Sequence, residues 1–363
     1  MGTSPLTLKM LFEDLGHEVI MPPRPTSRTL SLGTKYAPEF GCLPMKIVLG
    51  TYLEVLEQGA EILVTSGGCG PCRAGHYAQL HREILLDLGF SFELVVIELP
   101  RRGLLDFLGK IRRLNEKGLS WWGIWKIIKK AWAHLNALDE LESVSHYVRP
   151  RELVKGATDR AYRLAMSLME KARTPGEIEE ARRQGLEALR GVPQDPSRRP
   201  LKVGLVGEIY VVLEPFANLQ IERVLGEMGV EVHRSIYLTG WTEENAVADT
   251  AGRIGGMDIK LAAEPYLPEM IGGHGQDSVG HTILYARHGF DGVIQLAPFS
   301  CIPEIVARSI LPAVSRELDI PVLTFFLDEM TGEAGFRTRL EAFVDLLARR
   351  RALREAAAAE VLG

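Results

Sequence analysis

Four cysteines lie in short motifs whose residue types and spacing could do chemistry. Cys69 and Cys72 form a C-x-x-C pair in "GGCGPCRAGHY", directly after the apolar run "EILVT". Cys42 in "GCLPMK" and Cys301 in "FSCIPEI" are each followed at the second position by proline. Proline is tolerated in the first turn of a helix, because its missing N–H would have no partner there. We therefore expect Cys42 and Cys301 to lie where a loop leads into a helix.

All four cysteines fall between an expected strand and an expected helix, and in parallel α/β sheets such loops gather at one edge. A helix N-terminus carries unpaired N–H groups and a positive dipole end, which should lower the pKa of a nearby thiol. Gly68 and Gly70, on either side of Cys69, would let backbone amides approach a bound group closely. Four converging thiolates could hold one tetrahedral metal ion or one 4Fe-4S cluster.

The spacing favours an iron-sulfur cluster and leaves two alternatives open, structural zinc and thiols that are unligated or redox-active. Structural zinc sites usually combine two closely spaced pairs of ligands, whereas these ligands extend from Cys42 to Cys301. Thioredoxin-like chemistry would use the C-x-x-C pair and leave Cys42 and Cys301 unexplained. In a reducing compartment, a cysteine cluster indicates metal binding or catalysis more than a disulfide framework.

Strand-like and helical runs alternate towards both ends of the chain, the pattern of parallel sheets covered by helices. We expect an α/β protein with two Rossmann-like domains, residues 1–100 and 201–363, and a helical insert with its linker over 101–200. The expected strands are "HEVIM", "EILVT" and "ELVVIE" in the first domain and "KVGLVG", "VEVHR", "DGVIQL" and "PVLTFF" in the second. In the insert, Thr174, Pro175 and Glu177 predict a helix start with a capping box. Cys42, Cys69 and Cys72 would then come from the first domain and Cys301 from the second.

Composition predicts an ordinary globular protein, with 46% hydrophobic and 25% charged residues. A net charge of -5 gives no general reason to expect nucleic acid or a membrane as the partner. The first residues resemble an amphipathic helix more than a signal peptide, so we expect a cytoplasmic protein. The insert carries Trp121, Trp122 and Trp125, and we expect these rings to pack in the core or at a contact between two subunits, more than on a membrane surface.

Five strings together resemble the family of 2-hydroxyacyl-CoA dehydratase and benzoyl-CoA reductase components. They are "GCLPMK", "GGCGPCRAGHY", "GGHGQDSVG", "PFSCIPE" and "DEMTGEAGFRTRLEAFVDLL". The chain is most similar to the stand-alone branch of dehydratase-related, CoA enzyme activase-like proteins. The resemblance covers both α/β halves and is weakest in the helical insert and at the N-terminus.

The resemblance implies a 4Fe-4S cluster held by cysteines between two Rossmann-like domains, with electrons from a separate ATP-hydrolysing activase dimer. Dehydratase subunits of that family use three cysteines and leave one iron open, whereas this chain has four cysteines in matching motifs. The simplest ligand set is Cys42, Cys69, Cys72 and Cys301. Full ligation favours electron transfer or a scaffold role for a larger assembly, and an open iron would favour an ATP-coupled reductase or an acyl-CoA dehydratase-like enzyme. The same resemblance and the tryptophans of the insert favour a homodimer, each subunit keeping its own cluster.

Further candidate residues lie in the expected ligand-side loops. Glu208 and His274 are the candidate site acid and proton donor, and Glu214 and His281 are weaker candidates. The "GGHGQDSVG" loop could place an anion such as a CoA phosphate at a helix N-terminus. Arg73 could pair with the charge of a cluster or substrate, whereas Lys46 is expected on a solvated helix face.

Overall fold

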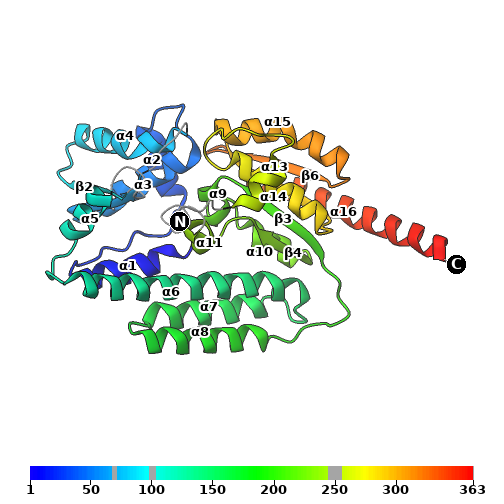
Figure 1. Ribbon diagram of the computed structural model, residues 1–363, viewed down its shortest axis with the longest axis horizontal. Helices are drawn as coiled ribbons and strands as arrows, with labels where there is room; N and C mark the ends of the chain where they lie inside the picture. Colours follow the sequence, from blue (N-terminus) through cyan, green and yellow to red (C-terminus); the bar gives the residue numbers. More distant parts are fainter. Residues whose placement is uncertain (68–71, 98–103, 244–255, 363) are drawn as a thin grey trace.

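The computed structural model describes residues 1–67, 72–97, 104–243 and 256–362 as a mixed α/β protein (Figure 1). It contains two parallel sheets, one of two strands and one of four, and a layer of long helices beneath them. The α/β class expected from the sequence is therefore confirmed.

The two-stranded sheet belongs to the first part of the chain. β1 (Ile62–Ser66) pairs in parallel with β2 (Glu93–Ile97), with Ile62 opposite Glu93. The helices around it are α1 (Ser4–Leu15), α2 (Ser27–Tyr36), α3 (Leu43–Leu56) and α4 (Ala74–Asp87). The strand expected at "HEVIM" was wrong, because residues 17–21 form no strand. The prolines of "MPPRP" follow at once, and proline cannot donate to a strand ladder.

The described part of the insert is helical, as expected. It comprises α5 (Leu104–Arg113), α6 (Trp121–Val148), the short 3-10 helix η2 (Arg149–Arg151), α7 (Ala157–Lys171) and α8 (Pro175–Arg190). The capping box predicted at the start of α8 is present, with the hydroxyl of Thr174 accepting from the N–H of Glu177. Leu138, Leu141, Met169 and Leu189 build the core of this helical layer.

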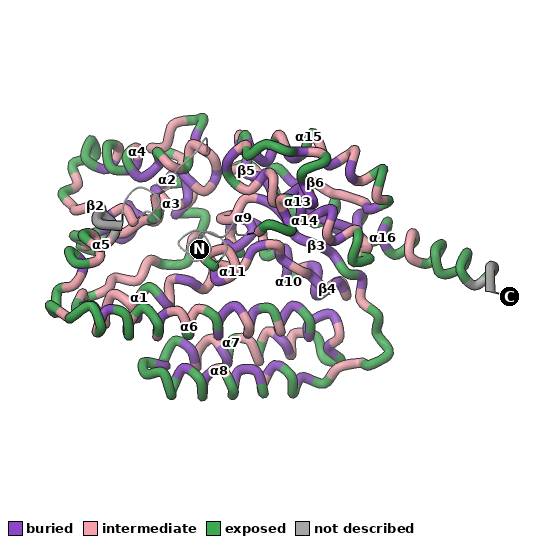
Figure 2. Tube along the Cα trace, viewed as in Figure 1, coloured by how far each residue is buried: buried purple, intermediate pink, exposed green. Residues whose placement is uncertain are grey.

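The four-stranded sheet has the order β4 (Val230–Arg234), β3 (Leu201–Gly207), β5 (Gly292–Pro298) and β6 (Val322–Leu327), all parallel. The last four expected strands are thus confirmed. One core joins its strands to α10 (Ile221–Glu227) and α16 (Glu333–Leu362), and a second core packs α13 (Met257–Ala263), α14 (Gly275–Arg287) and α15 (Ile302–Glu317) together. The buried residues follow this sheet, whereas the far end of α16 is exposed (Figure 2).

Helix α3 belongs to both cores and so joins the two α/β parts. Leu43 and Ile47, in its first turns, pack with the core of the four-stranded sheet. Leu49 and Leu53, further along, pack with the core around β1. This shared helix fixes the position of the residue at its N-terminus, which is Cys42.

Candidate functional site

The three cysteines that the structure describes all lie at helix N-termini. Cys42 is the N-cap residue of α3, Cys301 is the N-cap residue of α15, and Cys72 directly precedes Arg73, the N-cap residue of α4. Pro44 and Pro303 occupy the first turns of α3 and α15, as their spacing predicted. Cys69, Gly68 and Gly70 lie outside the described residues.

Hydrogen bonds tie the loops that carry these thiols to one another. The guanidinium of Arg73 donates to the carbonyl of Ser300 at 2.7 Å and to its hydroxyl at 3.2 Å. The same hydroxyl donates to the carbonyl of Phe40 at 3.2 Å, and Arg73 lies 5.9 Å from the centre of the Phe40 ring. Three segments distant in sequence therefore meet next to Cys42, Cys72 and Cys301.

The backbone between β5 and α15 is bent sharply to place Cys301 there. Ser300 has a φ of 66°, in the left-handed region that residues other than glycine rarely adopt. Such conformations persist where surrounding contacts hold them, and they concentrate at functional sites. The bonds to Arg73 and Phe40 supply those contacts here.

The environment of the thiols favours their protonated form. Burial is the main cause that raises the pKa of Cys42 and of Cys301, and the negative charge of Glu208 adds to it at both. The hydroxyl of Tyr77, 3.2 Å from the sulfur of Cys42, acts in the opposite direction. The expected lowering of these pKa values by the helix N-termini was wrong, because desolvation outweighs it. A bound cation or cationic cluster would be needed to hold both as thiolates.

Two acidic side chains face the thiols, and the sequence singled out one of them. Glu208 is the N-cap residue of α9 (Ile209–Leu213), and burial raises its pKa to about 7. Glu304 was missed; it is fully buried in the first turn of α15, where it accepts hydrogen bonds from Ser278 and Gln295. Burial raises the pKa of Glu304 to about 7 as well. Its place three residues after Cys301, in a first helical turn, was the signal available in the sequence.

The "GGHGQDSVG" loop packs on the same helix start. A Cβ atom on Gly275 would lie 2.4 Å from the carbonyl oxygen of Pro303, so only glycine fits this contact. His274 is the N-cap residue of α14, and burial lowers its pKa to about 4. Its Nδ1 atom is buried and has no hydrogen-bond partner among the residues that the structure describes. His281 lies further along α14, where burial also lowers its pKa to about 4.

The structure corrects one weaker expectation, that for Lys46, and adds contacts for Glu214 and Arg73. Lys46 is not on a solvated face; it is 5% exposed, and its ammonium lies 2.6 Å from the carboxylate of Glu329. Glu214 is also buried, and it accepts a hydrogen bond of 3.0 Å from the N–H of Gly2. Arg73 binds the loop before Cys301, and its expected role towards cluster or substrate charge stays a prediction.

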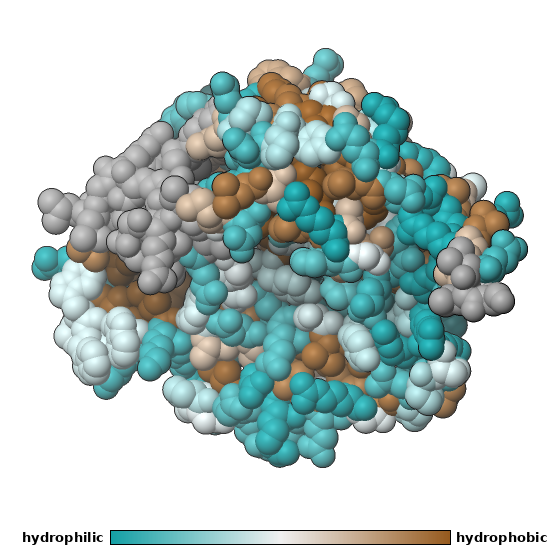
Figure 3. All heavy atoms as spheres, turned by 45° about the vertical axis from the view of Figure 1, so that its right-hand side comes forward, coloured by the Kyte–Doolittle hydropathy of each residue, from teal (hydrophilic) through white to brown (hydrophobic). Residues whose placement is uncertain are grey.

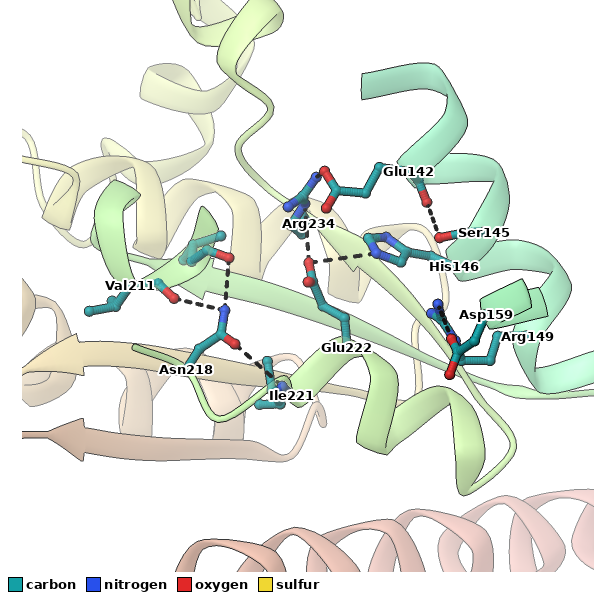
Figure 4. A network of polar contacts seen from close by, with 11 residues as sticks. Glu142, Ser145, His146, Arg149, Asp159, Val211, Asn218, Ile221, Glu222 and Arg234 are labelled. Carbon is teal, nitrogen blue, oxygen red and sulfur yellow. Dashed lines mark hydrogen bonds and ion pairs between the residues drawn. The ribbon is translucent and has the colours of Figure 1, made fainter. Parts of the chain in front are cut away.

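A second polar cluster lies where α6 meets α10 and β4 (Figure 4). The possible ligand atoms of Glu142, His146 and Glu222 all lie within 4.8 Å of one another. The guanidinium of buried Arg234 contacts both carboxylates, donating to Glu142 and lying 3.2 Å from Glu222. A resident cation therefore already balances these acids, and the cluster fastens the helical layer to the sheet.

No family model matches this chain. A stretch of 69 residues is 33% identical to "Peptidyl-prolyl cis-trans isomerase-like 2" of Gibberella zeae. The match covers 19% of this chain and 12% of that protein. A match this short does not place the chain in a family. The function must therefore be inferred from the geometry of the site.

Proposed function

We propose that this chain is an iron-sulfur protein whose 4Fe-4S cluster is held by Cys42, Cys69, Cys72 and Cys301. The proposal rests on one observation above all, the meeting of three thiol-bearing loops at helix N-termini from both α/β parts. Cys69 is three residues from Cys72 along the chain and would complete the set. When bound, such a cluster supplies one-electron chemistry at a potential set by its surroundings.

We prefer a cluster to a single zinc ion for this donor set. Zinc binds thiolates at about 2.3 Å, so its sulfur ligands would lie within roughly 4 Å of one another. Among the described residues, the group of ligand atoms within 4.8 Å of one another is Glu142, His146 and Glu222, and the three thiols form no such group. A cube spaces its thiolates more widely, because each binds a different iron. Structural zinc remains the alternative that metal analysis would reveal.

The sheet topology supports a ligand site at this place, and we interpret the two α/β parts as Rossmann-like domains. In the order β4-β3-β5-β6, the chain leaves β3 towards β4 on one side and later returns to pair β5 on the other. Ligands of open α/β sheets bind at such a switch point, beyond the carboxyl ends of the strands. Glu208 follows β3 there, and Cys301 follows β5.

We propose that the cluster takes low-potential electrons from an ATP-hydrolysing activase, for a reductive or dehydratase-type reaction on an acyl-CoA. Phe40, Phe299 and Ile302 leave 59%, 62% and 59% of their surface exposed beside the thiols, which suits a partner docking there. Glu208 and Glu304 would hold protons near neutral pH, and Glu208 and His274 are the candidate proton donors. A non-catalytic carrier or scaffold is the second candidate, favoured if all four thiolates close the cluster.

The change Cys301→Ser tests whether the cluster bridges the two parts. Serine is a better N-cap than most residues, so loss of iron could not come from a weakened helix start. We expect anaerobically purified Cys301→Ser protein to lose most of its iron and to melt at a lower temperature, since metal binding is linked to closure of the two parts. Ser309→Ala, on the exposed side of α15, is the matched control. Unchanged iron content and melting temperature in Cys301→Ser would exclude the proposed ligand.

A further inference from the structure

The first turns of α6 expose a stripe of large apolar side chains. Trp121, Trp125 and Ile128 recur at helical spacing and are 52%, 47% and 44% exposed. Trp122, beside them, is 61% exposed, and its ring stacks on that of Trp125 with centroids 4.7 Å apart. These rings were expected in a core or at a subunit contact. In the structure they do not fill the core of the chain.

Positive charge flanks this stripe. The ammonium groups of Lys126 and Lys129 lie 5.5 Å and 5.2 Å from the ring centres of Trp122 and Trp125. From Lys117 to Leu138 the sequence has no aspartate or glutamate, although the whole chain carries a net charge of -5. The nearby acid Asp14, on α1, is already paired with Lys130. The net charge of the whole chain is negative, whereas the surface around these tryptophans is basic and aromatic.

Contacts on other sides of α6 hold the helix that carries this stripe in place. Ile124 and Ala131, on the neighbouring side of α6, are buried, and the ion pair of Lys130 with Asp14 holds the helix against α1. Figure 1 places this end of α6 beside α1, at the left edge of the molecule. Figure 3 shows hydrophilic and hydrophobic residues mixed over the face that it displays. In the described part of the chain, no helix has the length and apolar character to cross a bilayer.

We propose that Trp121, Trp122, Trp125 and Ile128, with Lys126 and Lys129, dock this protein on the surface of an anionic membrane. Tryptophan rings favour the boundary between lipid headgroups and acyl chains, and flanking lysines attract anionic headgroups. The expectation of no membrane partner rested on the net charge of the whole chain, which does not describe this surface.

A second copy of the chain fits this surface less well. A two-fold contact would place the same patch on itself, so that the like charges of Lys126 and Lys129 from both copies would lie close together. The homodimer expected from the sequence is thus the rival occupant, and the experiment must separate the two.

The test measures binding of the full chain to vesicles made of equal parts phosphatidylglycerol and phosphatidylcholine, by co-sedimentation and by tryptophan emission. We expect binding with a blue shift of the emission, and little binding to vesicles of phosphatidylcholine alone. Lys126→Gln with Lys129→Gln should weaken binding about 30-fold, since each basic residue near an anionic surface contributes about a factor of five. Trp122→Ala with Trp125→Ala should weaken binding and reduce the blue shift, to which Trp121 would still contribute.

Arg349→Gln with Leu353→Ala, exposed positions of α16, is the matched control and should bind like the unchanged protein. All variants change exposed side chains, and equal melting temperatures would confirm that they fold. Absence of vesicle binding, or equal binding by the control and the lysine variant, would overturn the proposal. The proposal would also be overturned if light scattering showed a dimer that dissociates in the tryptophan variant, and vesicles bound neither the unchanged protein nor that variant.

Discussion

Arg73 donates a hydrogen bond of 2.7 Å to the carbonyl of Ser300, although 227 residues separate them along the chain. Arg73 is the N-cap residue of α4 and directly follows Cys72, and Ser300 directly precedes Cys301. The bond therefore holds two candidate ligands together from opposite α/β parts. It also supports the left-handed backbone of Ser300.

Arg73→Ala should destabilise the fold and weaken retention of the cluster. A hydrogen bond from a charged donor contributes about 1.5–3 kcal/mol, so we expect the free energy of unfolding to fall by about 2 kcal/mol. Thermal unfolding and iron content after gel filtration under anaerobic conditions measure the two effects. Arg82→Ala, which removes an exposed ion pair with Glu83 on the same helix, should change stability by less than about 1 kcal/mol. Equal losses of stability and of iron in the two variants would show that the Arg73 bond does not hold the two loops together.

Gly50→Ala should be severely destabilising, because α2 and α3 cross in close contact. A Cβ atom on Gly50 would lie 1.9 Å from the carbonyl oxygen of buried Thr29, so the helices would have to separate. We expect a loss of about 3 kcal/mol or more in denaturant unfolding, and a displaced α3 would carry Cys42 with it. Gly109→Ala, in α5 where a Cβ atom has open space, should instead stabilise the chain by about 0.5–1 kcal/mol. Tolerance of alanine at position 50 would refute the close crossing.

His81 should make stability depend on pH. Burial lowers its pKa from 6.5 to about 4, and its Nε2–H donates to the carbonyl of Met45 at 3.0 Å. The fold therefore favours the neutral ring: this contribution is complete above pH 6.5 and is lost as the pH falls towards 4. Because a tenfold change in proton affinity corresponds to about 1.4 kcal/mol, the contribution of the neutral ring amounts to about 3 kcal/mol.

The measurement compares unfolding of the unchanged protein and of His81→Gln between pH 7 and pH 5. We expect the cost of the substitution to shrink as the pH falls, because the unchanged protein loses stability that the variant no longer has. His76→Gln, at an exposed position of the same helix, is the control for replacing a histidine there. A cost of His81→Gln that stays constant or grows would contradict the buried neutral ring.

Local features of the fold could be predicted from the sequence, because they depend on neighbouring residues. Cys42 and Cys301 cap helices because proline two positions later suits the first turn of a helix. Thr174 and Glu177 close a capping box within four residues. The failure at "HEVIM" was also local, since the prolines that follow it block a strand.

Other features of the site depend on residues far apart in the chain, and no local pattern reveals them. Lys46 is buried because Glu329, 283 residues away, supplies its counter-charge. Glu304 looks like an ordinary first-turn acid until Ser278 and Gln295 are seen to enclose it. The pKa values of Cys42 and Cys301 were misjudged for the same reason, since their burial depends on both α/β parts.

The central claim is the cluster, and quantification of iron and acid-labile sulfide in the anaerobically purified chain tests it most directly. We expect about four irons and about four sulfides per chain, with the broad brown absorption of a cube. Because the ligands come from loops that the fold brings together, this content should survive gel filtration. Stoichiometric zinc, or a folded protein purified without oxygen that holds neither iron nor sulfide, would contradict the account.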